Sequence, residues 1–203
     1  VRRWKSTKTW DSLSNVKKLF REPKSSQQVE SILDAYSRGA HQKGGALLLS
    51  VVGGKMSEGI NFANEMARCV VVVGLPYPDI TDPELQEKMS AMDKGRGGIS
   101  GNAYYHNLCM RAVNQSIGRA IRHANDYASI LLVDERYRSD GRVWKALPDW
   151  LKRGSSSGIG REGSFEVTLS RLGHFYGGQG GVHWWGWFHS DECLYPNHGV
   201  VHP

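Results

Sequence analysis

The stretch Gln115-Ser116-Ile117-Gly118-Arg119-Ala120-Ile121-Arg122-His123 decides how the rest of the chain is interpreted. On a helix, the three-residue spacing of Arg119 and Arg122 places both guanidinium groups on one face, and Gln115 shares that face. Gly118 removes a side chain where another group has to approach closely. A glutamine and two arginines that point one way form a fork for a planar anion or a phosphate. The alternative is a basic amphipathic helix whose arginines are only solvated.

A second decisive stretch is a glycine-rich turn at the end of an apolar run. Residues 46–52 are apolar apart from one serine, which predicts a strand buried on both faces, as in a parallel sheet. The run leads directly into Gly53-Gly54-Lys55-Met56-Ser57-Glu58-Gly59-Ile60-Asn61-Phe62, at the strand end where open α/β sheets place ligands. This turn is not a Walker A loop, because Leu49 and Met56 stand where that loop needs a glycine and a serine or threonine. The alternative is a tight strand-to-helix turn without a ligand.

The remaining pattern predicts an α/β fold, with a parallel sheet flanked by helices. Four consecutive valines within residues 68–76, and the apolar run at 129–134, favour two further buried strands. Asp134 follows the last strand, and we expect it to orient neighbouring groups rather than to bind a metal. The expected helices cover residues 4–20, which are basic, 25–38, 82–92 with Leu85, Met89 and Met92 facing inwards, 104–124, and 145–153.

The composition is that of a globular protein with a basic body. Of the 203 residues, 39% are hydrophobic and 23% are charged, and the formal net charge is +6. Residues 1–153 hold 24 of the 26 Lys and Arg residues but 16 of the 20 Asp and Glu residues, which suits a polyanionic partner. The three cysteines form no Cys-x-x-Cys pair, which argues against a disulfide framework and a zinc site. No apolar run is long enough to cross a membrane, and residues 1–5 are not a secretory signal.

Residues 155–203 differ from the rest in composition. They open with the linker-like Ser155-Ser156-Ser157-Gly158-Ile159-Gly160 and hold ten of the 24 glycines, five of the eight histidines and three of the seven tryptophans. His183, His189, Cys193 and His198 have spacings that match no zinc pattern. We therefore expect two regions, a domain at 1–154 and a divergent tail at 155–203 with little stable structure.

Both decisive stretches resemble helicase motifs. The order Gln-x-x-Gly-Arg-x-x-Arg at residues 115–122 resembles motif VI of superfamily 2 helicases, and residues 53–62 resemble motif V. Residues 134–137, Asp-Glu-Arg-Tyr, are similar to the Asp-x-Arg-Tyr element that follows motif VI. About residues 17–153 thus resemble the second RecA-like motor domain of the iron–sulfur DEAH-type DNA helicases. This group includes the nucleotide-excision-repair and chromosome-cohesion helicases. The residues of the two stretches are most similar to those of the sister-chromatid-cohesion member.

The resemblance implies roles for particular residues. Arg119 and Arg122 would act as arginine fingers toward the terminal phosphate of ATP, and Gln115 would be a positioning group. The residues implied at the nucleotide site are Gly118, Glu58, Gly59 and Asn61, and those implied at the DNA backbone are Lys55 and Ser57. Asn61 stands where many relatives have aspartate.

The same resemblance implies that ATP and Mg²⁺ are held mainly by a first motor domain. This sequence contains no Walker A loop and no Asp-Glu-Ala-His box. The four cysteines that hold the family's iron–sulfur cluster are also absent, so this chain would not ligate the cluster.

The resemblance implies the C-terminal half of an ATP-driven 5′-to-3′ DNA helicase in the nucleus, with a role in DNA repair and chromosome cohesion. Its expected partners are single-stranded DNA, contacted through the backbone, and the first motor domain of the same helicase, with no membrane partner. The alternative is a truncated, non-catalytic module that binds nucleic acid or a partner. Val1 in place of an initiator Met favours an incompletely recorded helicase, whereas the unusual tail favours the truncated module.

Overall fold

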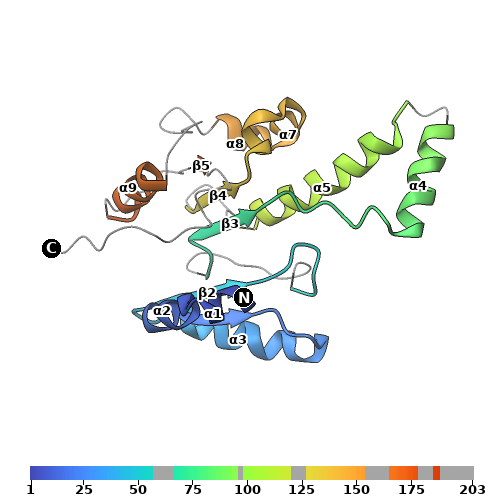
Figure 1. The fold of residues 1–203 in the computed structure, drawn as a ribbon. Coiled ribbons are helices and arrows are strands. Elements are labelled where there is room, and N and C mark those ends of the chain that lie inside the picture. The colour runs from blue at the N-terminus through green and yellow to red at the C-terminus, as the bar shows by residue number, and fades with distance from the viewer. Residues whose placement is uncertain (57–65, 96–97, 120–126, 154–164, 178–184, 188–203) are drawn as a thin grey trace. The chain divides into compact units, whose positions relative to one another are not determined.

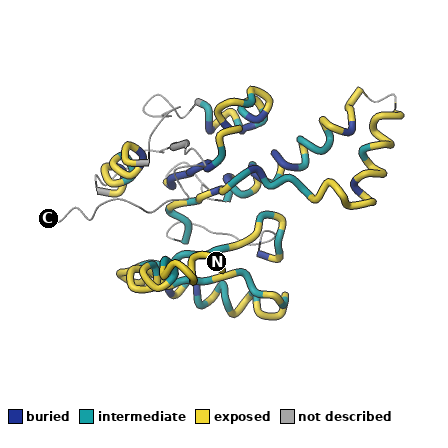
Figure 2. The backbone as a smooth tube through the Cα atoms, viewed as in Figure 1, coloured by how far each residue is buried: buried dark blue, intermediate teal, exposed yellow. Residues whose placement is uncertain are grey.

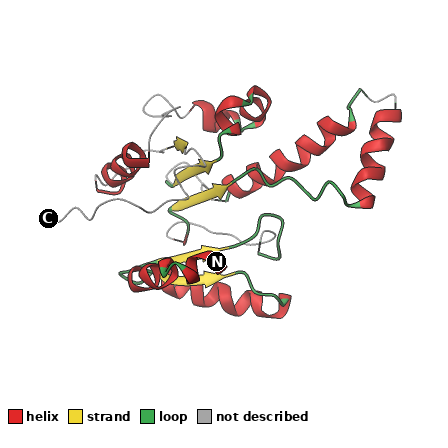
Figure 3. Ribbon diagram, viewed as in Figure 1, coloured by secondary structure: helices red, strands yellow, loops and turns green. Residues whose placement is uncertain are grey.

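The chain divides into two compact units, Val1–Ala67 and Arg68–Pro203. The computed structural model describes residues 1–56, 66–95, 98–119, 127–153, 165–177 and 185–187. Figure 1 labels the helices and strands, and Figure 3 colours them by type. Each unit combines parallel strands with helices, which confirms the predicted α/β class with parallel strands flanked by helices.

The first unit is built on two parallel strands. Its elements are α1 (Arg2–Ser6), α2 (Thr9–Val16), β1 (Lys18–Arg21), the 3-10 turn η1 (Ser26–Gln28), α3 (Val29–Ala40) and β2 (Ala46–Leu49). The register of β1 and β2 runs from Lys18 opposite Ala46 to Arg21 opposite Leu49. Two adjacent parallel strands need a crossover connection, and α3 supplies it.

An aromatic contact holds α3 against β1. Tyr36 of α3 is buried and meets Phe20 of β1 edge to face, with the ring centroids 5.7 Å apart. A Cβ atom at Gly39 would lie 3.2 Å from the Phe20 ring, so the glycine makes room for that ring. The Tyr36 hydroxyl donates to the carbonyl oxygen of Met66 at 2.5 Å, and burial raises the pKa of Tyr36.

The strand β1 corrects the prediction that residues 4–20 are helical. Helix α2 ends at Val16, and Lys18–Arg21 is a strand. Its two charged ends are exposed while Leu19 and Phe20 are half-buried. A four-residue strand is too short to show an alternating pattern, and its pairing with β2 depends on residues that lie 28 positions further along the chain.

The second unit carries a three-stranded parallel sheet in the order β3-β4-β5. Its elements are β3 (Cys69–Val73), α4 (Pro83–Lys94), α5 (Gly101–Ile117), β4 (Ser129–Val133), α6 (Arg136–Ser139), α7 (Gly141–Ala146), α8 (Asp149–Arg153), α9 (Phe165–Gly177) and β5 (Trp185–Trp187). The register of β3 and β4 runs from Cys69 opposite Ser129 to Val73 opposite Val133.

Strand β4 lies at the centre of the second unit, and all five of its residues are buried (Figure 2). Alternate side chains of a strand point to opposite faces. Ile130 and Leu132 belong to the main core, together with residues of α5, α7 and α8. Leu131 and Val133 point to the other face, where Leu172 of α9 packs against them. Helices α5, α7 and α8 therefore cover one face of β4, and α9 covers the other.

The predicted strands at 46–52 and 68–76 lie in different sheets rather than in one. β2 pairs with β1 in the first unit, and β3 pairs with β4 in the second. The prediction that both strands are buried on both faces is also wrong. The residues of β2 are only half-buried, and in β3 Val71 is 50% exposed and Val73 is 78% exposed.

Helix α4 follows the start signal in its sequence. The Asp82 carboxylate accepts a hydrogen bond from the backbone N–H of Glu84 at 3.0 Å, with Pro83 in the first turn. Leu85 is buried and Met89 is half-buried, as expected. Met92 is 40% exposed, so the prediction that it faces inwards is wrong.

Two stretches of the tail that the structure describes have regular structure. Residues 165–177, which the tail's composition leads us to expect without stable structure, form α9, and residues 185–187 form β5 beside β4. In α9, Phe175 is buried and meets Tyr127 edge to face at 5.9 Å between ring centroids. The Tyr176 hydroxyl lies 2.5 Å from the Ser129 hydroxyl and donates to the Arg68 carbonyl. Helix α9 is therefore part of the second unit.

Candidate nucleotide and nucleic-acid interface

The turn that resembles motif V lies at the carboxyl edge of the β1–β2 sheet. The two strands are parallel, so the backbone leaves the sheet at this edge after each of them, once after Arg21 and once after Leu49. The backbone N–H of Glu22 continues the ladder by donating to the Leu49 carbonyl at 2.8 Å. The backbone then turns, with the N–H of Gly54 donating to the Val51 carbonyl at 2.9 Å. Ligands of parallel sheets bind at such edges.

Two glycines lie in this turn, at Gly53 and Gly54. Gly53 has a φ of +77°, in the left-handed region that favours glycine. A Cβ atom at Gly54 would lie 2.3 Å from one carboxylate oxygen of Glu22. The Gly-Gly pair therefore has a conformational reason at the first position and a steric reason at the second.

Lys55 is exposed at the end of the turn. Its backbone N–H donates to Glu22, and its ammonium group donates to the carbonyl oxygen of Lys24. Met56, which follows, is 1% exposed and anchors the chain beyond the turn. The ammonium group of Lys55 thus lies at the surface of the edge, on a backbone that is held on both sides.

The stretch that resembles motif VI begins on α5 and runs past its end. Val113 and Ile117 are fully buried, whereas Gln115 is exposed on the last turn of the helix. The predicted helix 104–124 begins three residues earlier, at Gly101, and ends at Ile117. Gly118 and Arg119 lie in a turn, so the argument that Gln115 and Arg119 share one helix face does not hold.

Gly118 has a close neighbour at this helix end. It caps α5 in the right-handed region, with its N–H bonded to the Asn114 carbonyl at 2.9 Å. A Cβ atom at Gly118 would lie 3.2 Å from that same oxygen, which is tighter than ordinary contact. Arg119 is half-buried in the turn that follows.

The predicted site residues fall into three groups. Gln115, Gly118 and Arg119 lie together at the end of α5 in the second unit, and Lys55 belongs to the first unit. The others, namely Ser57, Glu58, Gly59, Asn61 and Arg122, lie outside the described residues.

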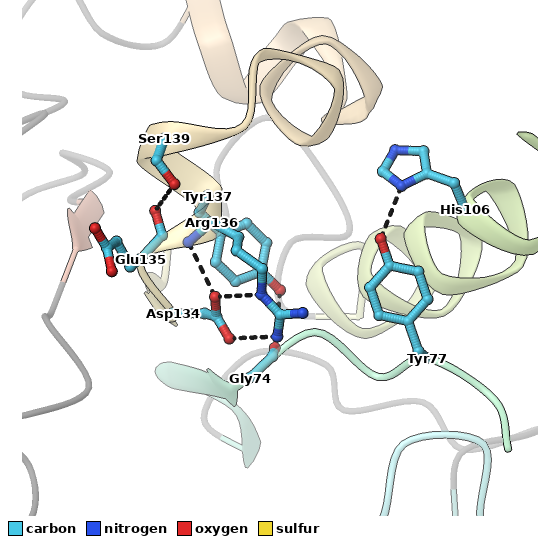
Figure 4. A network of polar contacts seen from close by, with 8 residues as sticks. All are labelled: Gly74, Tyr77, His106, Asp134, Glu135, Arg136, Tyr137 and Ser139. Atoms are coloured by element: carbon cyan, nitrogen blue, oxygen red, sulfur yellow. Dashed lines mark hydrogen bonds and ion pairs between the residues drawn. The ribbon is translucent and has the colours of Figure 1, made fainter. Parts of the chain in front are cut away.

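Asp134 follows β4 and orients Arg136, as expected (Figure 4). The Asp134 carboxylate accepts from the Arg136 side chain at 2.9 and 2.8 Å and from the Arg136 backbone N–H at 2.9 Å. The hydrogen bonds from the Arg136 side chain hold the pKa of Asp134 below its ordinary value. The next residue, Tyr137, is fully buried and donates to the Gly74 carbonyl at 3.2 Å, which joins the ends of β3 and β4.

A tyrosine and a histidine extend this network, as Figure 4 also shows. The Tyr77 hydroxyl lies 2.9 Å from Nδ1 of His106 on α5. The Arg136 guanidinium lies 5.9 Å from the centroid of the Tyr77 ring, within cation–π range. Burial raises the pKa of Tyr77, and burial raises the pKa of the Cys109 thiol on the same helix to about 11. Cys109 is therefore a protonated core residue rather than a nucleophile.

The donor set offers no resident metal site within the described residues. No group of three or more His, Cys, Asp or Glu side chains in those ranges could hold a metal ion. The chain has three cysteines in all, whereas a cubane iron–sulfur cluster takes four cysteine thiolates. Over the same part of the chain, no helix has both the length and the apolar character needed to cross a membrane.

Sequence reasoning missed Glu22, whose carboxylate holds the turn after β2. The residue follows β1, and its position at a strand end would have been a signal, but that strand was expected to be helix. It also missed Tyr77 and His106, which are brought together across 29 residues of sequence. No local pattern marks such a pair.

Comparison with known proteins agrees with these motifs. A family model described as the helicase C-terminal domain matches residues 1–154. The zebrafish (Danio rerio) protein named ATP-dependent DNA helicase DDX11 is 52% identical over 161 residues, which cover 73% of this chain and 18% of that protein. ATP-dependent DNA helicase CHL1 of Debaryomyces hansenii is 48% identical over 160 residues, covering 74% of this chain and 19% of the yeast protein.

A third relative extends the similarity into the tail. ATP-dependent DNA helicase CHL1 of Meyerozyma guilliermondii is 44% identical over 182 residues, covering 85% of this chain and 22% of that protein. The alignment covers 85% of the 203 residues, which is more than the 154 residues that the family model matches. It therefore reaches beyond residue 154. The chain spans about a fifth of the length of the curated relatives that it matches.

Proposed function

The chain belongs to the helicase C-terminal domain family, and from this premise we propose that it is the second motor half of an ATP-dependent DNA helicase. Both relatives quoted at about 50% identity are named ATP-dependent DNA helicases. In this role the chain contacts DNA and completes a nucleotide site whose other half lies on a first motor domain. We further propose 5′-to-3′ unwinding, a nuclear location, and a part in DNA repair and chromosome cohesion.

The observation that carries the proposal is the anchored turn after β2. It presents Lys55 at the carboxyl edge of parallel strands, and its backbone is fixed by hydrogen bonds before any ligand binds. The first unit also holds most of the excess positive charge, with 11 Lys and Arg residues against 6 Asp and Glu residues. A basic unit with a preformed turn suits the phosphodiester backbone of single-stranded DNA, which we propose that Lys55 and Ser57 contact.

The nucleotide role is assigned to the end of α5 and the residues after it. Arg119 and Arg122 would stabilise the charge that develops on the transferred phosphoryl group, with Gln115 as a positioning group. The further contacts proposed at the nucleotide are those of Gly118, Glu58, Gly59 and Asn61. ATP and Mg²⁺ would be held mainly by the first motor domain.

The DNA contact is tested by the affinity of the 203-residue chain for a fluorescent oligothymidylate. Lys55→Ala should weaken binding and lower the slope of log K against log salt by about 0.7, the value for one phosphate on a single strand. Lys43→Ala is the matched control, since Lys43 is an exposed lysine of the same unit outside the turn. Equal losses for the two variants would mean that only net charge matters.

The nucleotide role is tested with this chain joined to a first motor domain. Arg122→Ala should abolish ATP turnover and leave ATP binding nearly intact, because a finger acts on the transition state rather than on the bound nucleotide. Arg111→Ala, at an exposed arginine of α5, is the control and should keep turnover. Unchanged turnover in Arg122→Ala would remove that residue from the finger role.

The second candidate is a non-catalytic module that binds nucleic acid or a partner. It is favoured by the unusual composition of residues 155–203, which lie beyond the family match. DNA binding by itself fits either candidate, so the discriminating measurement is ATP turnover when a first motor domain is supplied. Turnover that needs Arg122 supports the motor half, whereas DNA binding without any turnover supports the module.

A further inference from the structure

Glu22 is the one acidic residue whose side chain reaches the turn after β2 within the described residues. It lies directly after β1, and its two carboxylate oxygens accept from two different backbone N–H groups of the turn. One oxygen accepts from Val51 at 2.8 Å and the other from Lys55 at 2.7 Å. These are charge-assisted hydrogen bonds, which are stronger than those between neutral groups.

The backbone of the turn passes close to this carboxylate at Gly54. A Cβ atom at Gly54 would lie 2.3 and 2.7 Å from the two oxygens of Glu22, far inside contact distance. The backbone N–H of Glu22 is itself held by the Leu49 carbonyl at 2.8 Å. The carboxylate therefore bridges the end of one strand to the turn that follows the other.

We infer that Glu22 is a positioning residue, which holds the Gly53–Lys55 turn in the shape that contacts a DNA phosphate. This rests on the proposed function, in which that turn meets the DNA backbone. Glu22 acts through the backbone of Val51 and Lys55 and does not touch the DNA. Without it, the turn loses both hydrogen bonds that fix it from the β1 side.

Because Glu22 is negatively charged, the inference can be tested by whether removal of the carboxylate strengthens or weakens DNA binding. A carboxylate beside a phosphate-binding surface opposes binding through its charge alone, so its removal should then strengthen binding. If the carboxylate holds the turn, its removal should weaken binding. Glu22→Gln separates the two cases, because the amide keeps the size of the side chain and replaces one acceptor by a donor.

The first experiment measures the affinity of the full 203-residue chain for a fluorescent oligothymidylate. Glu22→Gln should bind at least about threefold more weakly than the unaltered chain, since one charge-assisted hydrogen bond is lost. Glu30→Gln is the matched control, because Glu30 is an exposed glutamate of the same unit on α3. It should bind as tightly as the unaltered chain or slightly more tightly. Binding by Glu22→Gln that equals or exceeds that of the control overturns the inference.

A second experiment reads the turn itself, without DNA. Amide hydrogen exchange at Val51 and Lys55 should be about tenfold faster in Glu22→Gln than in the unaltered chain, because both amides lose a charged acceptor. Amides of α3 serve as the internal control and should not change. Unchanged exchange at Val51 and Lys55 overturns the inference even if the DNA affinity falls.

The two proposals fail in different ways. Weaker binding in Lys55→Ala together with unweakened binding in Glu22→Gln overturns the role of Glu22 and leaves the DNA contact in place. Unweakened binding in Lys55→Ala overturns the DNA contact at the turn, and the inference with it. Weaker binding in both variants, with Glu30→Gln unaffected, supports both.

Discussion

Asp134, directly after β4, and Asp140, at the start of α7, make the same local arrangement. Each carboxylate accepts from the backbone N–H two residues later and from the guanidinium group of that same residue, Arg136 or Arg142. These hydrogen bonds lower the pKa of both aspartates. Each arginine is thereby fixed against its own backbone, so the direction of its side chain is set locally.

Asp140 gives a prediction for the pH dependence of stability. Hydrogen bonds from the Arg142 side chain lower the pKa of Asp140 from 3.8 to about 2 in the folded state. The stabilisation is complete above the unfolded-state pKa and is lost as the pH falls from about 4 to about 2. The unaltered chain should therefore have a higher thermal midpoint than Asp140→Asn at pH 5–7, and the two midpoints should converge near pH 2.

The control for this prediction is the same substitution in an Arg142→Gln background. There the guanidinium partner is already missing, so Asp140→Asn should change the midpoint much less. A difference between Asp140→Asn and the unaltered chain that persists undiminished at pH 2 would contradict the argument.

Gly101 is a position where a single methyl group should matter. A Cβ atom there would lie 2.6 Å from the Met89 carbonyl oxygen and 2.9 Å from the Asp93 carboxylate, which belong to α4. Gly101→Ala should lower the free energy of unfolding by about 1–3 kcal/mol in urea denaturation, because α4 and α5 would have to separate. Gly141→Ala, with nothing within 4 Å of its Cβ, should be neutral or slightly stabilising.

Helix α9 differs from the expectation that the chain's last fifty residues have little stable structure. It covers the face of β4 that α5 and α7 leave open, and its Tyr176 and Phe175 reach residues at the amino end of the sheet. An α/β sheet needs helices on both faces to bury its strands. The composition of residues 155–203 did not predict this helix, because glycine-rich stretches flank it in the sequence.

Two leucines of α9 allow a matched test of this packing. Leu172 is half-buried and contacts the buried pair Leu131 and Val133, whereas Leu169 is 49% exposed. Leu172→Ala should lower the free energy of unfolding by about 1–2 kcal/mol, and Leu169→Ala should change it by less than about 0.5 kcal/mol. Equal costs, measured by urea denaturation, would mean that α9 does not dock on β4.

Elements with strong local signals were predicted well from the sequence. Asp82 and Pro83 gave the start of α4, and the apolar run at 129–133 gave a strand that is buried throughout. The errors concern non-local pairing. β1 is a strand because β2 lies beside it, and the exposed Val71 and Val73 show that four valines do not by themselves bury a strand.

The candidate site shows the same limit. Lys55, Gln115 and Arg119 lie in motifs that are contiguous in sequence, so a sequence pattern could single them out. Glu22 contacts the N–H of Lys55 across 33 residues, and Tyr77 contacts His106 across 29. Such contacts exist only after the strands have paired, and no periodicity or motif in one sequence encodes them.

For the whole chain, the distribution of charge agrees with the division into two units. The first unit carries a formal charge of +5, from 11 cationic and 6 anionic residues, out of +6 for the chain. The second unit is nearly neutral and carries the two arginines proposed as fingers toward ATP, Arg119 and Arg122. DNA affinity should thus depend on salt mainly through the first unit.

The isolated chain should not hydrolyse ATP above background, with or without single-stranded DNA. The reason is that its sequence has no Walker A loop to cradle the phosphates. Phosphate release from the purified 203-residue chain measures this, with the same chain joined to a first motor domain as the positive control. DNA-stimulated turnover by the chain alone would contradict the prediction.

The order of helices around β4 also bears on how the protein is made on the ribosome. Leu131 and Val133 remain uncovered until Leu172, which lies about 40 residues later in the chain, has been translated. At about 5–20 residues per second, the synthesis of these residues takes about 2–8 s. The β1–β2 pair of the first unit is complete once residue 49 has emerged. Nascent chains should therefore recruit chaperones mainly between the synthesis of β4 and that of α9.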